Sequence, residues 1–258
     1  MAVVRTEMVD LKVNGDGAQA FVARLDDEAV RPGVVLIQEW WGLEPHIKEL
    51  AQRLAAEGFV AAVPDLYHGK IATEPDDAQK MIMMIQGNVE KAVREVDGAI
   101  DSLITRPDVQ PKKVGLIGFC VGGFVAYKTA EQSDKLAAVC PFYGAGYDPT
   151  PADVAKVQAP ILAFYGEKDQ SVPAAQIDKI RSLFKDAGKD YQALTYPAGH
   201  AFVNPEHGMG DADSARDAWA KAIAFLKDHL AVCRRERRDA VRDRSSAAGM
   251  ECAARRRV

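Results

Sequence analysis

The sequence lacks the features that mark several large classes of protein. No run approaches the roughly 18 consecutive apolar residues that a membrane-spanning helix needs, so we expect no membrane span. The first residues, MAVVRTEMVDLKV, contain no basic region followed by an apolar one, so we expect no secretory signal and a cytoplasmic location. Only four cysteines occur among 258 residues, and no two form a CxxC pair. A disulfide framework and a zinc site are therefore both disfavoured.

An excess of charge of one sign is also missing. Lys and Arg number 33 against 37 Asp and Glu, a formal net charge of −4, which argues against a globally basic nucleic-acid binder. The exception is the segment 232–258, which holds nine arginines, four acidic residues and almost no large apolar residues. Such a segment cannot bury enough surface to offset its ordering entropy, so we expect it to be disordered and residues 1–231 to form the folded domain. We expect no nucleic-acid partner, and deletion of 232–258 tests that expectation.

What the sequence does contain is an alternation of strand and helix patterns. Short continuous apolar runs predict buried strands at 33–37, 60–63, 114–118, 137–143, 161–165 and 191–196. Apolar residues at helical spacing predict helices at 45–57, 75–86, 88–105, from 121, 173–187 and 211–230. This alternation indicates an α/β fold, with a mainly parallel central sheet and helices on both faces. Two alternating runs within 8–25, around Asn14-Gly15-Asp16-Gly17, predict an N-terminal antiparallel hairpin at one edge.

The most informative string is Gly118-Phe119-Cys120-Val121-Gly122, which joins a predicted strand to a predicted helix. A nucleophile elbow needs this arrangement, because glycines two residues before and after the nucleophile make room for a tight, strained turn. The turn lifts the side chain to the helix N-terminus, where backbone N–H groups favour a thiolate and later an oxyanion. The alternative is a glycine-rich turn in which Cys120 only packs.

Later residues favour the catalytic interpretation. Asp169 follows the predicted strand 161–165, and His200 follows the predicted strand 191–196. Nucleophile, acid and then histidine is the chain order of α/β-hydrolases, in which the imidazole takes the nucleophile's proton and the acid fixes its tautomer. Glu39 follows the strand 33–37, where it is either a carboxylate that exchanges a proton with the thiol or an ordinary loop acid.

These residues carry a resemblance to the dienelactone hydrolase family of α/β-hydrolases, the carboxymethylenebutenolidases. The resemblance covers roughly residues 8–230 and excludes the arginine-rich segment. The matching strings are Gln38-Glu39-Trp40-Trp41-Gly42, Pro64-Asp65-Leu66-Tyr67, Gly118-Phe119-Cys120-Val121-Gly122-Gly123, Phe142-Tyr143-Gly144, Gly166-Glu167-Lys168-Asp169 with Val172-Pro173, and Tyr196-Pro197-Ala198-Gly199-His200-Ala201-Phe202. Together they are specific to the family, though not to one substrate.

The resemblance implies an α/β-hydrolase fold and a role for each matching residue. Cys120 would be the nucleophile, His200 the base and Asp169 the acid that orients the histidine. Glu39 stands at the family's position for a carboxylate that contacts the resting thiol and helps to form the thiolate only when substrate is bound.

The resemblance also implies how the substrate is held. Backbone N–H groups of Val121 and Trp40 would form the oxyanion hole. Tyr143, Trp41 and Phe202, which follow strand ends, are expected to face the substrate pocket, although aromatic residues there are often core or pocket wall.

One feature departs from the family pattern. Family members that open dienelactone hold its carboxylate with two arginines, one just beyond the catalytic histidine and one in the helix after the fourth strand. Here Asn204 stands near the first position, and Lys80 is the only basic residue of 74–86. A lysine binds a carboxylate as a point charge, without the two-pronged geometry of arginine. The adjacent Met81-Ile82-Met83-Met84 fits either helix packing or an apolar pocket wall.

Two functions of different classes follow from these residues. The first is a hydrolase that takes a small-molecule ester or lactone and forms an acyl-thioester through Cys, His and Asp, with no cofactor, acting as a monomer or weak dimer. The second is a non-catalytic or redox-sensing α/β protein with a reactive elbow cysteine, which needs no His–Asp pair. No metal is expected, because His46, His68, His207 and His229 lack metal-ligand spacing.

Overall fold

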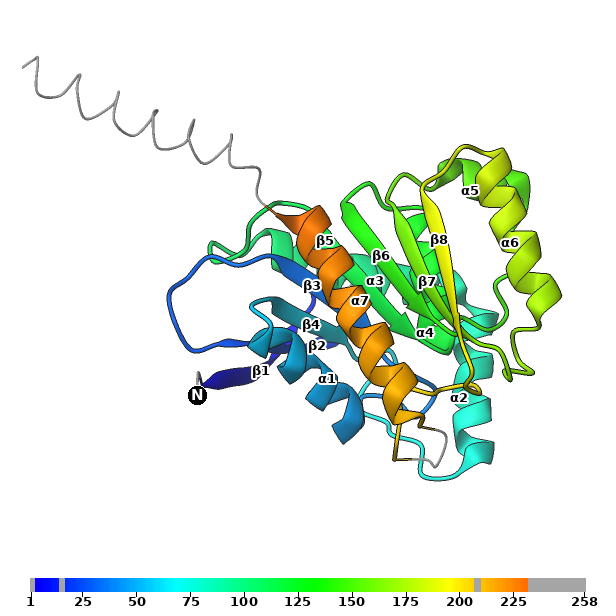
Figure 1. Ribbon diagram of the computed structural model, residues 1–258. Coiled ribbons are helices and arrows are strands. Elements are labelled where there is room, and N and C mark those ends of the chain that lie inside the picture. The colour runs from blue at the N-terminus through cyan, green and yellow to red at the C-terminus, as the bar shows by residue number, and fades with distance from the viewer. Residues whose placement is uncertain (1–2, 14–16, 207–209, 232–258) are drawn as a thin grey trace, which may run out of the picture.

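The computed structural model describes residues 3–13, 17–206 and 210–231 (Figure 1). Its strands are β1 (Val4–Asp10), β2 (Gln19–Leu25), β3 (Gly33–Ile37), β4 (Val60–Pro64), β5 (Val114–Phe119), β6 (Leu136–Phe142), β7 (Ile161–Gly166) and β8 (Tyr191–Tyr196). Its helices are α1 (Pro45–Ala56), α2 (Pro75–Gly87), α3 (Val89–Ile104), α4 (Val121–Ala130), α5 (Pro151–Lys156), α6 (Ala174–Asp186) and α7 (Ala212–Leu230). Within the described ranges, no helix combines the length and apolarity needed to cross a bilayer.

All eight strands form one sheet in the order β1-β2-β4-β3-β5-β6-β7-β8. From β4 through β3 to β8 the neighbours are parallel, whereas β1 pairs with β2 and β2 with β4 in antiparallel fashion. The predicted α/β-hydrolase architecture, a mainly parallel sheet with an N-terminal antiparallel pair, is therefore confirmed. The predicted turn at 14–16 lies outside the described residues, and so does the segment 232–258, for which we predict disorder. The domain boundary at 231 therefore stays a prediction.

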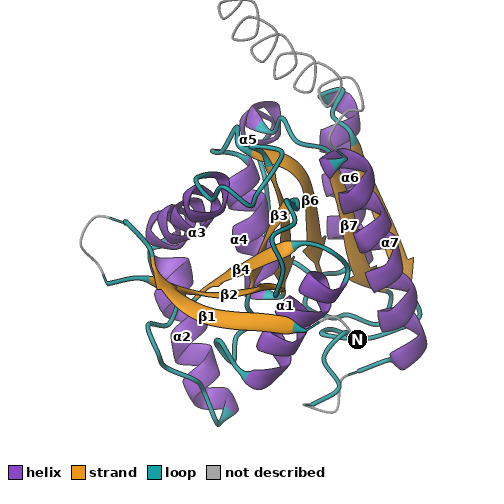
Figure 2. Cartoon of the chain, turned by 90° about the vertical axis from the view of Figure 1, so that its left-hand side faces the viewer, coloured by secondary structure: helices purple, strands orange, loops and turns teal. Residues whose placement is uncertain are grey.

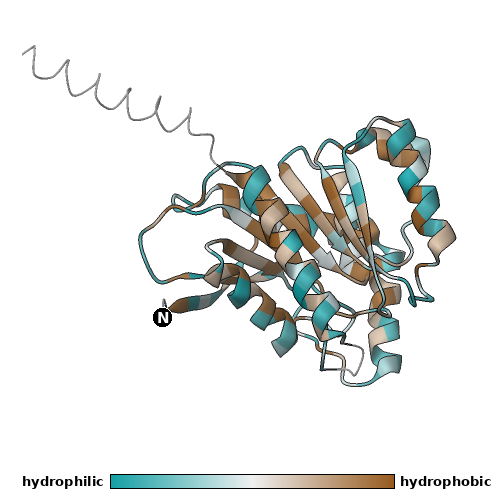
Figure 3. Ribbon diagram, in the orientation of Figure 1, coloured by the Kyte–Doolittle hydropathy of each residue, from teal (hydrophilic) through white to brown (hydrophobic). Residues whose placement is uncertain are grey.

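Helices cover both faces of the sheet (Figures 1 and 2). On one face α1 and α7 pack over the strands, and on the other face α3, α4 and α6 do so. The central strands are coloured mainly as hydrophobic in Figure 3, and every residue of β3, β5 and β7 is buried. This burial explains why these strands are continuous apolar runs without alternation.

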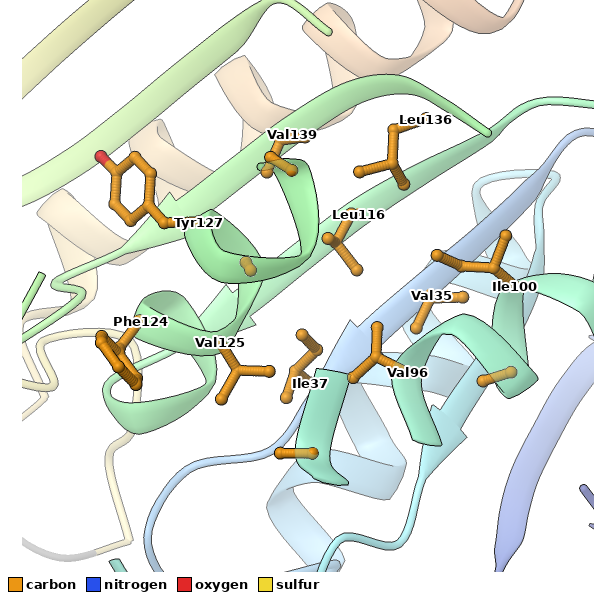
Figure 4. Packing of buried hydrophobic residues seen from close by; sticks show 14 of the residues in the cluster. Val35, Ile37, Val96, Ile100, Leu116, Phe124, Val125, Tyr127, Leu136 and Val139 are labelled. Carbon is orange, nitrogen blue, oxygen red and sulfur yellow. The ribbon is translucent and has the colours of Figure 1, made fainter. Parts of the chain in front are cut away.

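The larger of the two packed layers joins the sheet to α3 and α4. Side chains of β3 and β5, such as Ile37 and Leu116, contact Val96 of α3 and Val125 of α4, all fully buried (Figure 4). Burial of such side chains supplies most of the stabilisation, at about 25 cal/mol for each Å² of apolar surface removed from water. The packing holds the carboxyl ends of the parallel strands in fixed positions, and the loops that follow them carry the candidate site.

The short helix α5 is the one element of the described chain that the apolar pattern did not predict. Its signal is local and polar: Thr150 and Asp153 form a reciprocal capping box, and Pro151 occupies the first turn. Such a box satisfies two backbone N–H groups that a helix start otherwise leaves without partners. A six-residue helix with Val154 as its buried residue is too short to show apolar periodicity.

We predict that Leu226→Ala lowers the free energy of unfolding by about 2–5 kcal/mol. Leu226 is fully buried on α7, and a Cβ added at Gly115 of β5 would lie 2.5 Å from its side chain, so this contact locks α7 onto the sheet. Urea denaturation measures the change. Asp228, an exposed residue of the same helix, supplies the control. Asp228→Ala should change the free energy of unfolding by less than about 0.5 kcal/mol. Equal effects of the two substitutions would contradict this packing.

Candidate active site

The chain turns sharply at Cys120, between the end of β5 and the start of α4. Cys120 has φ 54° and ψ −117°, a left-handed conformation that L-residues rarely adopt. Its N–H donates to the carbonyl oxygen of Phe142 at 3.1 Å, and its own carbonyl accepts the N–H of Phe124 at 3.1 Å. The neighbouring strand and the helix therefore hold the residue in a strained geometry.

Two glycines make this turn sterically feasible. A Cβ at Gly118 would overlap the carbonyl oxygen of Gly122, and a Cβ at Gly122 would overlap the carbonyl oxygen of Gln38 on the adjacent strand end. Backbone atoms cannot move aside as a flexible side chain can. The Gly-x-Cys-x-Gly spacing is thus a packing requirement of the turn.

The turn brings Cys120 to an imidazole and a carboxylate from distant strand ends. Nε2 of His200, which follows β8, lies 3.1 Å from Sγ of Cys120. Nδ1 of the same ring lies 2.7 Å from Oδ2 of Asp169, which follows β7. Asp169 is 5% exposed, and its other oxygen accepts the N–H of Ser171 at 2.7 Å. The three side chains form one continuous hydrogen-bonded series.

The surroundings of His200 favour its protonated form. Burial acts to lower the pKa of the imidazole, but the hydrogen bonds to Asp169 and Cys120 and the negative charges of these two groups outweigh burial and raise the pKa to about 10. A protonated imidazole that bonds to Asp169 on one side and faces Sγ of Cys120 on the other is the partner that a cysteine thiolate would require.

Glu39 lies beside this series and is almost completely buried, with 1% of the residue exposed. The hydroxyl of Tyr143 donates to its Oε1 at 2.9 Å, and the amide of Asn204 donates to its Oε2 at 2.7 Å. Burial raises the pKa of Glu39, while the two hydrogen bonds and the charge of His200 oppose that rise and Glu44 adds to it. Both oxygens are thus engaged by Tyr143 and Asn204, in place of the contact with the resting thiol that the family resemblance implies.

Asn204 is the site residue whose role the sequence did not reveal. It is fully buried, and its amide also lies 3.4 Å from Oε1 of Glu44. Its own oxygen accepts the N–H of Glu206 at 3.0 Å. The family resemblance leads us to expect an arginine near this position, and no local sequence pattern shows that the partner of Asn204 is a carboxylate 165 residues away.

The two expected oxyanion donors come from different parts of the chain. Val121 is the first residue of α4, and Trp40 follows Glu39 beyond β3. Among the residues that the structure describes, neither backbone N–H donates a hydrogen bond to another backbone or side-chain group. The first N–H groups of a helix have no intrahelical partner, which suits them to bind an anion.

Of the aromatic residues expected in the pocket, Tyr143 lies beside the imidazole and Phe202 lies beside Tyr143. The rings of Tyr143 and His200 lie 5.1 Å apart, and the rings of Tyr143 and Phe202 lie 5.4 Å apart. Trp41 is buried with its ring 4.9 Å from that of Trp40. All three residues are buried, and their facing a substrate pocket stays a prediction.

Lys80 is not brought to the cysteine. It lies on α2 with its ammonium 2.9 Å from Oδ1 of Asp77, and 73% of its side chain is exposed. The carboxylate-binding role expected of Lys80 therefore receives no support from its position. The sequence alone could not show which face of α2 turns toward water.

The sequence profile of the Dienelactone hydrolase family matches residues 18–230. A protein of Aquifex pyrophilus named usf is 36% identical over 231 residues, and a protein of Aquifex aeolicus (strain VF5) with the provisional name carboxymethylenebutenolidase is 33% identical over 231 residues. Each alignment covers 87% of this chain and 99% of the relative.

A solved structure shows the same likeness. The crystal structure of a dienelactone hydrolase-like promiscuous phosphotriesterase from metagenomic libraries superimposes with a TM-score of 0.82 at 26% identity, covering 89% of this chain and 100% of that one. The family profile spans most of the chain, and the relatives match it over nearly their whole length. This protein belongs to the dienelactone hydrolase family.

Proposed function

We propose that this protein hydrolyses small esters or lactones through an acyl-thioester on Cys120. The observation that carries the proposal is the hydrogen-bonded series from Cys120 through His200 to Asp169, mounted on a strained elbow. Membership of the dienelactone hydrolase family and the provisional name of the Aquifex aeolicus relative support the same reaction class.

The reaction proceeds in two halves. In the first, the thiolate of Cys120 attacks the carbonyl carbon, and the backbone N–H groups of Val121 and Trp40 stabilise the resulting oxyanion. The tetrahedral intermediate collapses with breakage of the ester C–O bond, and the imidazolium of His200 gives its proton to the departing oxygen. Asp169 keeps the imidazole in one tautomer throughout.

In the second half, water hydrolyses the thioester. Neutral His200 takes a proton from water as the water oxygen attacks the thioester carbonyl. The C–S bond then breaks, the carboxylic acid product leaves, and the thiolate and imidazolium are restored. A thiolate is a much better leaving group than an amine, so attack on an amide tends to revert, whereas an enolate or phenolate leaves readily. Activated esters and enol-lactones are therefore better substrates than amides.

Glu39 acts on the charge of this pair. Its carboxylate interacts favourably with protonated His200, and Tyr143 and Asn204 keep it oriented. A buried carboxylate that is hydrogen-bonded on both oxygens can hold its charge in an apolar site, which an unpartnered one cannot. We therefore assign Glu39 a positioning and electrostatic role toward the cysteine–histidine pair.

We predict that Cys120→Ala abolishes turnover of 4-nitrophenyl acetate and of simple lactones while the circular dichroism spectrum stays that of the wild type. The reason is that no other group can form the thioester. Cys120→Ser should retain a small residual activity, because a hydroxyl needs stronger base assistance than a thiol. Unchanged turnover in Cys120→Ala would reject the mechanism. Rapid alkylation of wild-type Cys120 without any ester turnover would instead favour a redox-sensing role.

A second prediction concerns the imidazole of His200. Its pKa of about 10 means that the ring stays protonated through neutral pH and loses its proton only as the pH rises through that value. Asp169→Asn and Cys120→Ala each remove a hydrogen bond and a negative charge, so each should lower the midpoint while burial continues to depress it. Nitrogen-15 NMR titration of the ring measures all three midpoints. A wild-type midpoint near the ordinary 6.5 that Asp169→Asn leaves in place would contradict the assignment.

A third prediction uses two substitutions with opposite signs. Asn204→Leu removes a hydrogen bond that lowers the pKa of Glu39, so the acid limb of the pH profile of kcat/KM should move to higher pH. Glu44→Gln removes a negative charge that raises the same pKa, so the limb should move to lower pH. If the acid limb moves in the same direction in both variants, Glu39 does not govern it.

A further inference from the structure

A cleft of about 270 Å³ lies between the loop after β4, α2 and the start of α3. Its apolar wall is formed by Tyr67, Met81, Met84 and Ile85. The cleft is at the small end of the range for sites that bind small molecules, so a short alkyl chain or one ring suits it better than a large ligand. The mechanism described above uses none of these four side chains.

Tyr67 is the polar group of that apolar wall. The residue is 6% exposed, and its hydroxyl oxygen is buried with no hydrogen-bond partner among the described residues. Its position is rigid, since its N–H donates to Oδ1 of Asp65 at 3.1 Å and its ring packs against Gly42. Buried hydroxyls almost always have a partner, so one without a partner, held in place beside a cleft, is arranged for a group that the ligand brings.

Two observations connect the cleft to the cysteine. Burial raises the pKa of Tyr67, and a negative charge on Cys120 would raise it further, so the phenol and Cys120 interact electrostatically. In addition, Met81 packs in the same small apolar cluster as Trp40, whose backbone N–H is one of the two proposed oxyanion donors. A substrate bound at the oxyanion donors can therefore extend along this wall.

The polar end of the cleft offers little to a carboxylate. Nε2 of His68 lies 3.0 Å from Oε1 of Glu95, and the ammonium of Lys91 lies 3.8 Å from the same oxygen. Glu95 is buried, and its negative charge offsets these neighbouring cations. Lys70 at the rim is exposed to water, where a charge pair contributes little.

The apolar surface continues outward from the cleft. Met84 is 68% exposed and Ile71, in the loop before α2, is 46% exposed. The methionine side chain is unbranched and adapts its shape to different apolar partners. Contiguous patches of exposed apolar side chains often mark binding sites. The rim as well as the wall thus favours an apolar ligand.

We propose that this cleft receives an apolar substituent of an uncharged ester or lactone, and that the Tyr67 hydroxyl donates a hydrogen bond to an oxygen of that substrate. The inference rests on the proposed function and names its substrate class. It makes Met84 a specificity-determining residue and Tyr67 a substrate-positioning one.

The first test compares two neighbouring methionines. Met83 is 62% exposed, nearly as much as Met84, but it does not line the cleft, so Met83→Lys is a matched control for Met84→Lys. The readout is the ratio of kcat/KM for 4-nitrophenyl hexanoate to that for 4-nitrophenyl acetate. We expect Met84→Lys to lower this ratio about tenfold, which corresponds to about 1.4 kcal/mol, and Met83→Lys to leave it unchanged. Equal effects of both substitutions, or no effect of either, would overturn the proposal.

The second test removes the hydroxyl alone. Tyr67→Phe should lower kcat/KM for the hexanoate ester about tenfold, leave the rate of Cys120 alkylation by iodoacetamide unchanged, and keep or raise the thermal midpoint, since a buried hydroxyl without a partner is lost. A residue that only fills space would show unchanged kinetics, which would overturn the proposal. A parallel loss of alkylation would also overturn it, because the hydroxyl would then act on the cysteine and not on the substrate.

A binding measurement separates this inference from the proposed function. In the Cys120→Ala variant with ¹³C-methyl methionine, 4-nitrophenyl hexanoate should shift the methyl resonance of Met84 and leave that of Met83 in place. If the wild type hydrolyses acetate esters but no shift occurs, the cleft assignment fails alone. If the shift occurs but the wild type hydrolyses no ester, the proposed function fails alone.

Discussion

The left-handed backbone of Cys120 is the constraint around which the site is built. A non-glycine residue in such a conformation costs on the order of 1–3 kcal/mol, and the surrounding structure must offset that cost. Here the backbone of Gly122 fits against the strand end at Gln38 so closely that no side chain is tolerated, and the N–H of Cys120 is bonded to Phe142 of the neighbouring strand. The bend therefore cannot relax without separating α4 from the sheet.

The same strain recurs along one edge of the sheet. Four non-glycine residues with positive φ occur in the described chain, and each follows a parallel strand: His68 at 51°, Cys120 at 54°, Tyr143 at 37° and Ala201 at 53°. Ala201 directly follows His200, and Tyr143 bonds to Glu39. Strained residues persist where the surrounding contacts over-determine them, and they cluster at functional sites. The edge that carries the candidate triad is thus also where the fold departs most from relaxed geometry.

Periodicity and turn chemistry were sufficient to predict the sheet, its antiparallel edge and the strand ends at which Cys120, Asp169 and His200 lie, because these features are encoded in consecutive residues. The contacts of Asn204 and Tyr67 were not predictable in the same way. Asn204 meets Glu39 across 165 positions, and the burial of the Tyr67 hydroxyl depends on how α2 packs over the loop after β4. The outward direction of Lys80 has the same origin, since helical spacing in a segment with apolar residues on several sides does not specify which side faces the sheet.

The electrostatics of the site lead to the same substrate class as the cleft. Glu39, Glu44 and Asp169 are all buried in this part of the molecule, and protonated His200 interacts favourably with Glu39 and Asp169. A substrate carboxylate would enter a site already rich in negative charge. Near the position where the family resemblance implies an arginine, this chain has the uncharged amide of Asn204. Bringing a further anion into low dielectric without a cation to pair it is strongly unfavourable. An uncharged substrate avoids that penalty. Only in the transition state would it develop an oxyanion, which the proposed donors, the backbone N–H groups of Val121 and Trp40, would stabilise.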